Sequence, residues 1–182
     1  IILKTMKYGE TFKFYWREIL LGVLIFSCIA VWSAVLERSD VGVLSVYFLD
    51  VGQGDAIFIE TPNKHQMLID GGKNRQVISE LGKILPFGDK SIDVLMATHP
   101  DADHIGGLPE VINRFDVGMF VETGVESDNT LDDELDKGLE EENIERVIAK
   151  RGMIINFGDG AKLKILFPNQ DVSRWETNDA SI

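Results

Sequence analysis

The chain has 182 residues, of which 45% are hydrophobic, so it is long and apolar enough to form one folded domain with an additional segment, and general disorder is excluded. Its net charge of −12, from 18 basic and 30 acidic residues, opposes non-specific binding to nucleic acid, because that binding depends on Lys and Arg side chains that displace counterions from phosphates. We therefore expect no strong basic patch for such binding, and any contact with DNA would need a local basic path or a metal ion.

The first element expected is a transmembrane helix over residues 19–36. This run of eighteen residues carries no charge, and in an α-helix it rises about 27 Å, close to the roughly 30 Å hydrocarbon core of a bilayer. Residues 1–18 hold basic and aromatic side chains and are expected to be a cytoplasmic juxtamembrane segment. The rest of the chain would then lie on the outer face of the cytoplasmic membrane. A signal peptide and a buried helix are the alternatives, and residues 33–37 offer only a weak cleavage site.

A short linker over residues 37–42 is expected to precede a folded domain over residues 43–182. Alternating apolar residues predict three strands at its start, over 43–49, 56–61 and 67–70. His65 lies in the predicted turn between the last two strands, which favours a turn role over a ligand role. Gly52 and Gly54 permit positive φ and a close approach of the backbone to another group, which suits a tight loop beside a site between the first two strands. The alternative is an ordinary glycine turn.

The remaining elements alternate between helices and strands. Apolar residues at helical spacing predict helices over 77–85, 108–115 and 130–139, and apolar runs predict strands over 92–98, 117–122, 146–149 and 162–167. Residues 126–145 contain ten acidic residues and one lysine, which predicts a solvated surface helix with a narrow buried seam rather than a calcium site. This alternation predicts a layered α/β fold.

Four potential metal ligands directly follow the predicted strand over 92–98: His99, Asp101, Asp103 and His104. Pro100 disfavours a helix at His99, so an extended loop can turn His99 and Asp101 one way and Asp103 another, and His104 is expected to begin the next element. Imidazole and carboxylate ligands suit zinc, manganese or iron, and such a metal converts water into a nucleophile near neutral pH. The alternative is a solvated acidic loop with two incidental histidines, although the chain has only three histidines in all.

This stretch resembles the first metal-binding motif of the metallo-β-lactamase fold, His-x-His-x-Asp-His. Here it is His-x-Asp-x-Asp-His, with Asp101 at the place of the second histidine. Together with the Ile-Gly-Gly-Leu that follows, it resembles the branch related to the DNA-internalisation competence protein ComEC. Three further segments match that branch, at residues 48–56, 68–72 and 178–182. The resemblance implies an α/β fold, the αββα sandwich, of which residues 43–182 would form the N-terminal half to two-thirds.

The resemblance also implies roles for the four loop residues. His99 and Asp101 would hold one divalent ion, and Asp103 and His104 would hold another, with zinc or manganese as the metal. A hydroxide between the two ions would attack an ester, which makes Asp103 a candidate catalytic residue as well as a ligand.

Three residues outside the loop receive roles from the same resemblance. Gln53 and Asp55 would lie near the catalytic rim. Asp70 would hydrogen-bond the metal loop and hold the ligands in orientation, and the alternative for Asp70 is a helix N-cap.

The resembled site has further ligands, a bridging aspartate and a final histidine, after the strand that corresponds to residues 178–182. No histidine follows His104 in this chain, which ends at Ile182 within that expected strand. We therefore expect a domain truncated at its C-terminus, with weak metal binding and little activity by itself. A degenerate site is the alternative.

The function expected from these features is a membrane-anchored, metal-dependent hydrolase that acts on phosphodiesters such as DNA outside the cytoplasmic membrane. One alternative is a non-catalytic component of DNA uptake or DNA binding with a degenerate metal site. Another is a true β-lactamase, which Asp101 disfavours because it replaces a histidine of the general motif.

Overall fold

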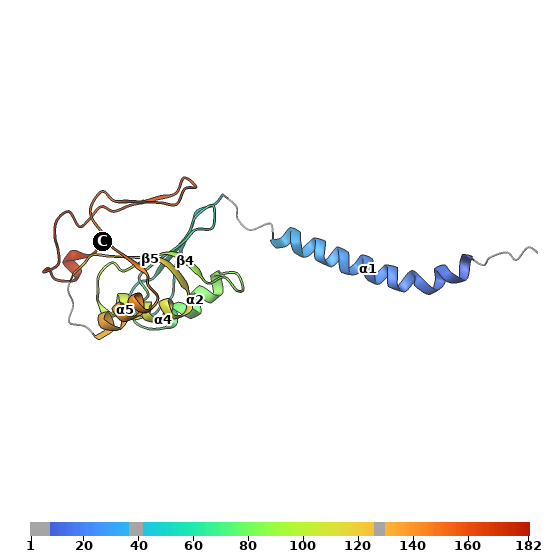
Figure 1. The fold of residues 1–182 in the computed structure, drawn as a ribbon, viewed down its shortest axis with the longest axis horizontal. Coiled ribbons are helices and arrows are strands. Elements are labelled where there is room, and N and C mark those ends of the chain that lie inside the picture. Colours follow the sequence, from blue (N-terminus) through green and yellow to red (C-terminus); the bar gives the residue numbers. More distant parts are fainter. Residues whose placement is uncertain (1–7, 37–41, 126–129) are drawn as a thin grey trace, which may run out of the picture. The chain divides into compact units, whose positions relative to one another are not determined.

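The computed structural model describes residues 8–36, 42–125 and 130–182, and the chain divides into two compact units, Ile1–Val41 and Gly42–Ile182. The first unit holds one long helix, α1, from Tyr8 to Leu36 (Figure 1). Its stretch Tyr15–Ser33 is long and apolar enough to cross a membrane, and no part of that stretch is buried. The helix begins before the expected span, and the expected linker over 37–42 lies outside the described residues except for Gly42.

The second unit is built on a mixed sheet whose strands follow one another in chain order. The strands are β1 Ser45–Phe48, β2 Ile57–Glu60, β3 Gln66–Ile69, β4 Ser91–Met96, β5 Asp116–Glu122 and β6 Glu145–Ile148. The first three strands pair antiparallel, and β3 to β6 pair parallel. The strands expected in these six places are confirmed, with ends that differ by one or two residues.

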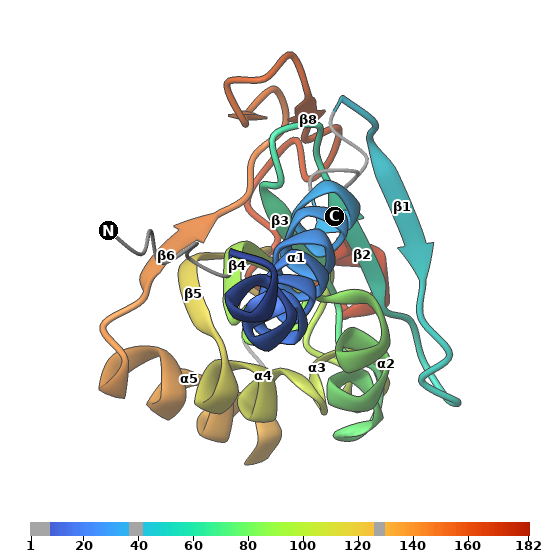
Figure 2. The same ribbon diagram turned by 90° about the vertical axis from the view of Figure 1, so that its right-hand side faces the viewer.

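Helices cover one face of this sheet, as Figures 1 and 2 show. They are α2 Gln76–Ile84, the short α3 Ala102–Ile105, α4 Leu108–Arg114 and α5 Thr130–Glu141. Their apolar sides form the main core with strand residues such as Phe58, Leu95 and Phe120. Leu135 and Leu139 are buried in α5, which confirms the expected narrow seam of an otherwise acidic helix.

A small hairpin covers the opposite face. Its strands are β7 Ile154–Asn156 and β8 Lys162–Lys164, which pair antiparallel. Val94 and Met96 of β4 pack in the second core cluster toward this hairpin, whereas Leu95 packs toward the helices. Both faces of β4 are therefore buried near its end, which explains why Val94, Leu95 and Met96 are all apolar.

The expectations for the last part of the chain need three corrections. The strand expected over 162–167 is shorter, and β7 was not expected. Residues 178–182 do not form a strand, because Asn178–Ala180 is a turn of 3₁₀ helix. The polar residues there favour turns, and the Ala180 N–H bonds to the carbonyls of Glu176 and Thr177 instead of a neighbouring strand. The Ile182 N–H donates to the Thr98 carbonyl oxygen at 3.1 Å, so this segment lies against the predicted metal loop.

Candidate metal centre

The metal loop, residues 97–104, begins where β4 ends. The Ala97 N–H continues the pairing with β5 through the Val121 carbonyl at 2.9 Å, and the Asp70 N–H bonds to the Met96 carbonyl at 2.8 Å. Because β3, β4 and β5 are parallel, their carboxyl ends meet at one edge of the sheet, the usual position of functional loops in such sheets. The helix after the loop begins at Ala102, two residues earlier than expected, so Asp103 and His104 both lie on it.

Asp70 fastens this loop from the end of β3. Its carboxylate is buried and accepts hydrogen bonds from the Thr98 N–H at 2.8 Å and the Thr98 hydroxyl at 2.7 Å. It also bonds to His104 Nδ1 at 2.9 Å. The N-cap interpretation of Asp70 is wrong, because α2 begins at Gln76 and its N-cap residue is Arg75. The structure thus places Asp70 against the loop, where a hydrogen bond to Nδ1 leaves Nε2 of His104 as the basic nitrogen.

His99 has a buried nitrogen with no partner. The side chain is 5% exposed, and its Nε2 makes no hydrogen bond. The other ring nitrogen, Nδ1, lies 3.0 Å from the Thr98 hydroxyl oxygen. Because that hydroxyl already donates its one proton to Asp70, it must accept from Nδ1, so Nε2 of His99 carries the lone pair. A buried lone pair without a hydrogen-bond donor is energetically unfavourable in a protein core. A position as a metal ligand would satisfy this lone pair.

The pKa values of the two histidines shift in opposite directions. Burial lowers the pKa of His99, and the neighbouring His104 lowers it further. The hydrogen bond to Asp70 raises the pKa of His104 against the effect of burial. The two rings lie 4.0 Å apart between centroids. The environment of His99 therefore favours its neutral form, which is the form that binds a metal ion. The neighbouring His104 has its protonated form stabilised by Asp70.

Asp101 lies near the unpartnered Nε2 of His99. Its Oδ2 is 3.5 Å from Nε2 of His99. A lone pair facing a carboxylate oxygen is repulsive unless a cation or a proton lies between them, and two ligands of a tetrahedral zinc ion with bonds of about 2.0–2.1 Å lie roughly 3.4 Å apart. Asp101 also accepts hydrogen bonds from the Thr177 hydroxyl and, at 2.9 Å, from the Asn178 amide.

Asp103 is held at the rim of the loop. Gln53 Nε2 donates to its Oδ2 at 3.4 Å, and the Lys73 amine donates to Gln53 Oε1 at 3.1 Å.

Gly54 has φ +90°, and a Cβ atom there would lie 1.6 Å from the Asp103 carbonyl oxygen. Only glycine fits that position, so the close approach is observed at Gly54, whereas a Cβ at Gly52 would have no atom nearer than 3.8 Å. Asp55 accepts from the Gly72 N–H through its backbone, at 2.9 Å.

The predicted set of four ligands stays a prediction. The structure brings His99 next to Asp101 and His104, and it pairs Asp103 with Gln53. Across residues 8–36, 42–125 and 130–182, no three His, Cys, Asp or Glu side chains are arranged to hold a metal ion. The donor types and the orphan nitrogen of His99 fit a divalent cation, whereas full convergence of the ligands is not observed.

Sequence reasoning missed the residues that support the loop. Thr98 joins Asp70 to His99, and Thr177 and Asn178 contact Asp101 from a distance of more than seventy positions in the chain. A threonine next to a predicted ligand is a weak local signal. No pattern in the sequence connects Thr177 to the loop, because that contact depends on the path of the whole C-terminal segment.

A family model described as the metallo-beta-lactamase superfamily matches residues 49–149, more than half of the chain and the whole of the metal loop. The chain belongs to the metallo-beta-lactamase superfamily. The α/β fold with one apolar N-terminal helix agrees with the fold expected from the motifs. Members of the superfamily are metal-dependent hydrolases, and their fold generally binds divalent metals, typically zinc.

The chain is 29% identical over 131 residues to ComE operon protein 3 of Bacillus subtilis strain 168, which supports the expected ComEC-like branch of the superfamily. The match covers 63% of this chain and 17% of that protein's length. Solved structures of metallo-beta-lactamases are also similar. A motif mutant of the Cronobacter sakazakii enzyme has 17% identity and a TM-score of 0.48, with 67% of this chain and 50% of that chain covered. The Rm3 enzyme has 17% identity and a TM-score of 0.45, with 65% and 47% covered.

Proposed function

We propose that this protein is a membrane-anchored, metal-dependent hydrolase of phosphodiesters, with DNA as the substrate. The observation that carries the proposal is Nε2 of His99, a buried, unprotonated nitrogen without a partner in a superfamily of metal-dependent hydrolases. Its position beside Asp101 and His104 favours a divalent cation over a structural role in the core.

His99, Asp101, Asp103 and His104 are the residues proposed to hold two divalent ions, zinc or manganese. Such ions supply a water that ionises near neutral pH and a positive charge beside the ester. The chain's own residues prepare the site in three ways. Asp70 orients His104 and, through Thr98, fixes the tautomer of His99. The Lys73–Gln53 pair orients Asp103 at the rim.

A phosphodiester is proposed over a lactam on two grounds. The relative from Bacillus subtilis is named for the ComE operon, and the motifs resemble the competence branch. In addition, Asp101 replaces a histidine of the general motif. A true β-lactamase would have to work with this altered ligand set, and hydrolysis of nitrocefin by the intact protein would be the result that favours it.

The test replaces His99 in the intact, full-length protein, purified in detergent, and uses the third histidine as control. His99→Ala should lose metal at least 10-fold relative to wild type, measured by elemental analysis after equilibration with Zn²⁺ or Mn²⁺, and should lose hydrolysis of a bis-aryl phosphodiester. His65→Ala should retain both, because His65 lies in a turn beside Asp93. The proposal fails if metal-supplemented wild-type protein cleaves no phosphodiester and Asp103→Ala changes nothing.

A non-catalytic DNA-binding component is the second candidate, and the observation that favours it is that no three candidate ligands converge among the described residues. It predicts that the double variant His99→Ala/His104→Ala binds DNA as well as wild type does. The hydrolase proposal predicts instead that this variant loses metal-dependent turnover.

The apolar stretch Tyr15–Ser33 supports anchoring to the membrane by α1. The second unit is proposed to lie on the outer face because basic residues precede that stretch. The test introduces Ser79→Cys, an exposed position in α2, together with Cys28→Ser. A membrane-impermeant thiol reagent should label this variant in intact cells. Labelling only after lysis would place the second unit on the cytoplasmic side.

A further inference from the structure

The charge of the chain reverses locally after α5. Residues 146–174 contain six basic residues and two acidic ones, whereas the whole chain has a net charge of −12. Five of the bases form what we call the basic strip: Lys150, Arg151, Lys162, Lys164 and Arg174. All five are exposed, and within the described part of the chain none of them has a carboxylate within 4.0 Å. The net charge of the chain led us to expect no strong basic patch for nucleic acid. This local excess of basic residues limits that expectation to the rest of the chain.

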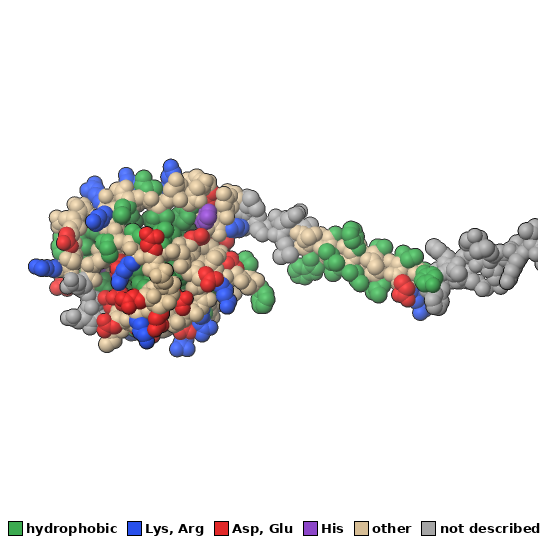
Figure 3. All heavy atoms as spheres, viewed as in Figure 1, with side chains coloured by type: hydrophobic (Ala, Val, Ile, Leu, Met, Phe, Trp, Pro, Cys, Tyr) green, Lys and Arg blue, Asp and Glu red, His purple; other side chains and the backbone are tan. Residues whose placement is uncertain are grey.

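The hairpin places its two lysines on one outer face. Lys162 and Lys164 are exposed, and Leu163 between them packs into the core below. Backbone pairing continues past the strands, because the Gly152 N–H bonds to Ile165 and the Arg151 N–H bonds to Pro168, at 2.8 and 2.7 Å. The paired segment that carries Lys150 and Arg151 therefore continues directly into the hairpin that carries Lys162 and Lys164. Figure 3 shows basic side chains along this edge of the molecule.

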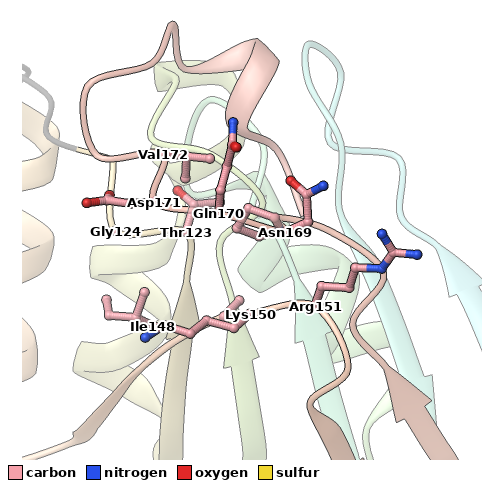
Figure 4. A pocket seen from close by; sticks show the side chains of 11 residues that line it. Thr123, Gly124, Ile148, Lys150, Arg151, Asn169, Gln170, Asp171 and Val172 are labelled. Atoms are coloured by element: carbon pink, nitrogen blue, oxygen red, sulfur yellow. The ribbon is translucent and has the colours of Figure 1, made fainter.

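The lower end of the strip borders a pocket of about 690 Å³. Its walls come from the ends of β5 and β6 and from residues 168–172, as Figure 4 shows. Arg151 and the amide of Asn169 extend on one side of the pocket, Lys150 extends on the other, and the Asp171 carboxylate points away. A pocket of this size accommodates a nucleotide-sized group. It lies at the same edge of the parallel sheet as the metal loop, one strand away.

The segment after the pocket leads to the metal loop. It carries Arg174 and then Trp175, whose ring is 38% exposed and lies 6.1 Å from the ring of Phe167. Two and three residues later, Thr177 and Asn178 donate hydrogen bonds to Asp101. Basic side chains, an exposed aromatic ring and the candidate metal centre therefore follow one another along a single segment.

We propose that the basic strip, with Trp175, binds the phosphate backbone of single-stranded nucleic acid and leads it to the metal loop. Unpaired, exposed Lys and Arg side chains neutralise successive phosphates, and an exposed aromatic ring stacks on a base whatever its identity. A single strand fits better than a duplex, because only unpaired bases can reach Trp175 and the pocket. This inference rests on the proposed function for the role of the metal loop, but binding at the strip needs no metal.

The test measures binding of fluorescein-labelled oligo-dT to the full chain in detergent, by anisotropy, with EDTA present so that hydrolysis plays no part. The triple variant Lys150→Gln/Arg151→Gln/Arg174→Gln should bind at least 10-fold more weakly at low salt. Its slope of log affinity against log salt should be smaller in magnitude by about 2. The control Lys83→Gln/Lys90→Gln/Lys137→Gln removes the same charge from exposed positions on other elements and should stay within about 2-fold of wild type. Equal weakening by both triples would overturn the proposal.

Trp175 provides a second readout. Trp175→Leu should weaken oligo-dT binding about 10-fold, and the fluorescence quenching that the oligonucleotide causes in wild type should disappear. Inorganic polyphosphate that binds as tightly as oligo-dT, with no dependence on Trp175, would indicate a generic polyanion site and overturn the proposal. Strip-dependent binding without phosphodiester cleavage would support the strip and contradict the hydrolase. Phosphodiester cleavage together with oligo-dT binding that the triple variant does not weaken would support the hydrolase and contradict the strip.

Discussion

The metal loop and the pocket end of the basic strip lie at the same edge of the sheet, but the loop and the strip depend on different physics. At the metal loop, Asp70 and His99 are 3% and 5% exposed, and neighbouring groups are joined by short hydrogen bonds. Removing one partner there leaves another buried polar group unsatisfied. The strip consists of exposed bases that have no carboxylate within 4.0 Å among the described residues. Substitutions should therefore affect stability at the loop and salt-dependent affinity at the strip.

The largest effect on stability is expected from Gly54→Ala. The new Cβ would overlap the Asp103 carbonyl oxygen, and φ of +90° is strained for any residue with a side chain. We expect a loss of about 3 kcal/mol in the free energy of unfolding, measured by denaturant titration with circular dichroism. Gly52→Ala is the control, because its φ is +79° but the nearest atom lies 3.8 Å from the added Cβ, so only about 1 kcal/mol should be lost. Equal losses would show that the contact with Asp103 is unimportant.

Asp70→Asn should have the next largest effect. Asparagine tolerates the φ of +58° at this position, but it cannot accept all three hydrogen bonds from Thr98 and His104. We expect a loss of about 2 kcal/mol in the free energy of unfolding and a 10- to 100-fold loss of metal affinity, roughly the cost of removing such a supporting group. The exposed Asp116→Asn is the matched control. If Asp70→Asn leaves the metal affinity unchanged, Asp70 does not support metal binding.

Asp132 connects the acidic helix α5 to the back of the metal loop, because it lines a small cavity with His99 and Pro100. Burial, followed by the charges of Asp136 and Glu122, raises its pKa to about 6. The folded state thus favours the protonated form, so this contribution to stability is full below pH 3.8 and is lost as the pH rises through 6.

Asp132→Asn should therefore unfold like wild type at pH 4 and be more stable at pH 8, by about 1 kcal/mol after allowance for solvent screening. Thermal unfolding at the two pH values measures this difference. Glu140→Gln, an exposed position of the same helix, should show no such pH dependence. A stabilisation that is equal at both pH values would exclude titration of Asp132 as its cause.

The smallest effect on stability is expected at the strip. Lys162→Gln/Lys164→Gln removes two exposed lysines without an ion pair and should change the free energy of unfolding by less than about 0.5 kcal/mol. Its affinity for oligo-dT should fall nevertheless, most strongly at low salt. Destabilisation comparable to that of Asp70→Asn would remove the contrast between the two regions.

Residues in the first two-thirds of the second unit could be predicted well because their signals are local. The apolar run before His99 predicted β4, the leucines at spacing four predicted the buried side of α5, and Gly54 predicted a close approach. The C-terminal segment was predicted poorly, since Asn178–Ala180 is a turn where a strand was expected and β7 was missed. The charge reversal at residue 146 was visible in the sequence, but a count over the whole chain concealed it.

By itself the sequence determined the candidate ligands, the apolar N-terminal helix and the α/β class, because composition, spacing and periodicity are properties of neighbouring residues. Only the tertiary structure decided that Thr98 fixes the tautomer of His99, that Asp70 holds His104 and that Thr177 and Asn178 reach Asp101. It also decided that the segment carrying the bases of residues 150–174 reaches a pocket at the same edge of the sheet as the metal loop. These contacts join residues far apart in the chain, and no local pattern specifies which distant groups the packed sheet will bring together.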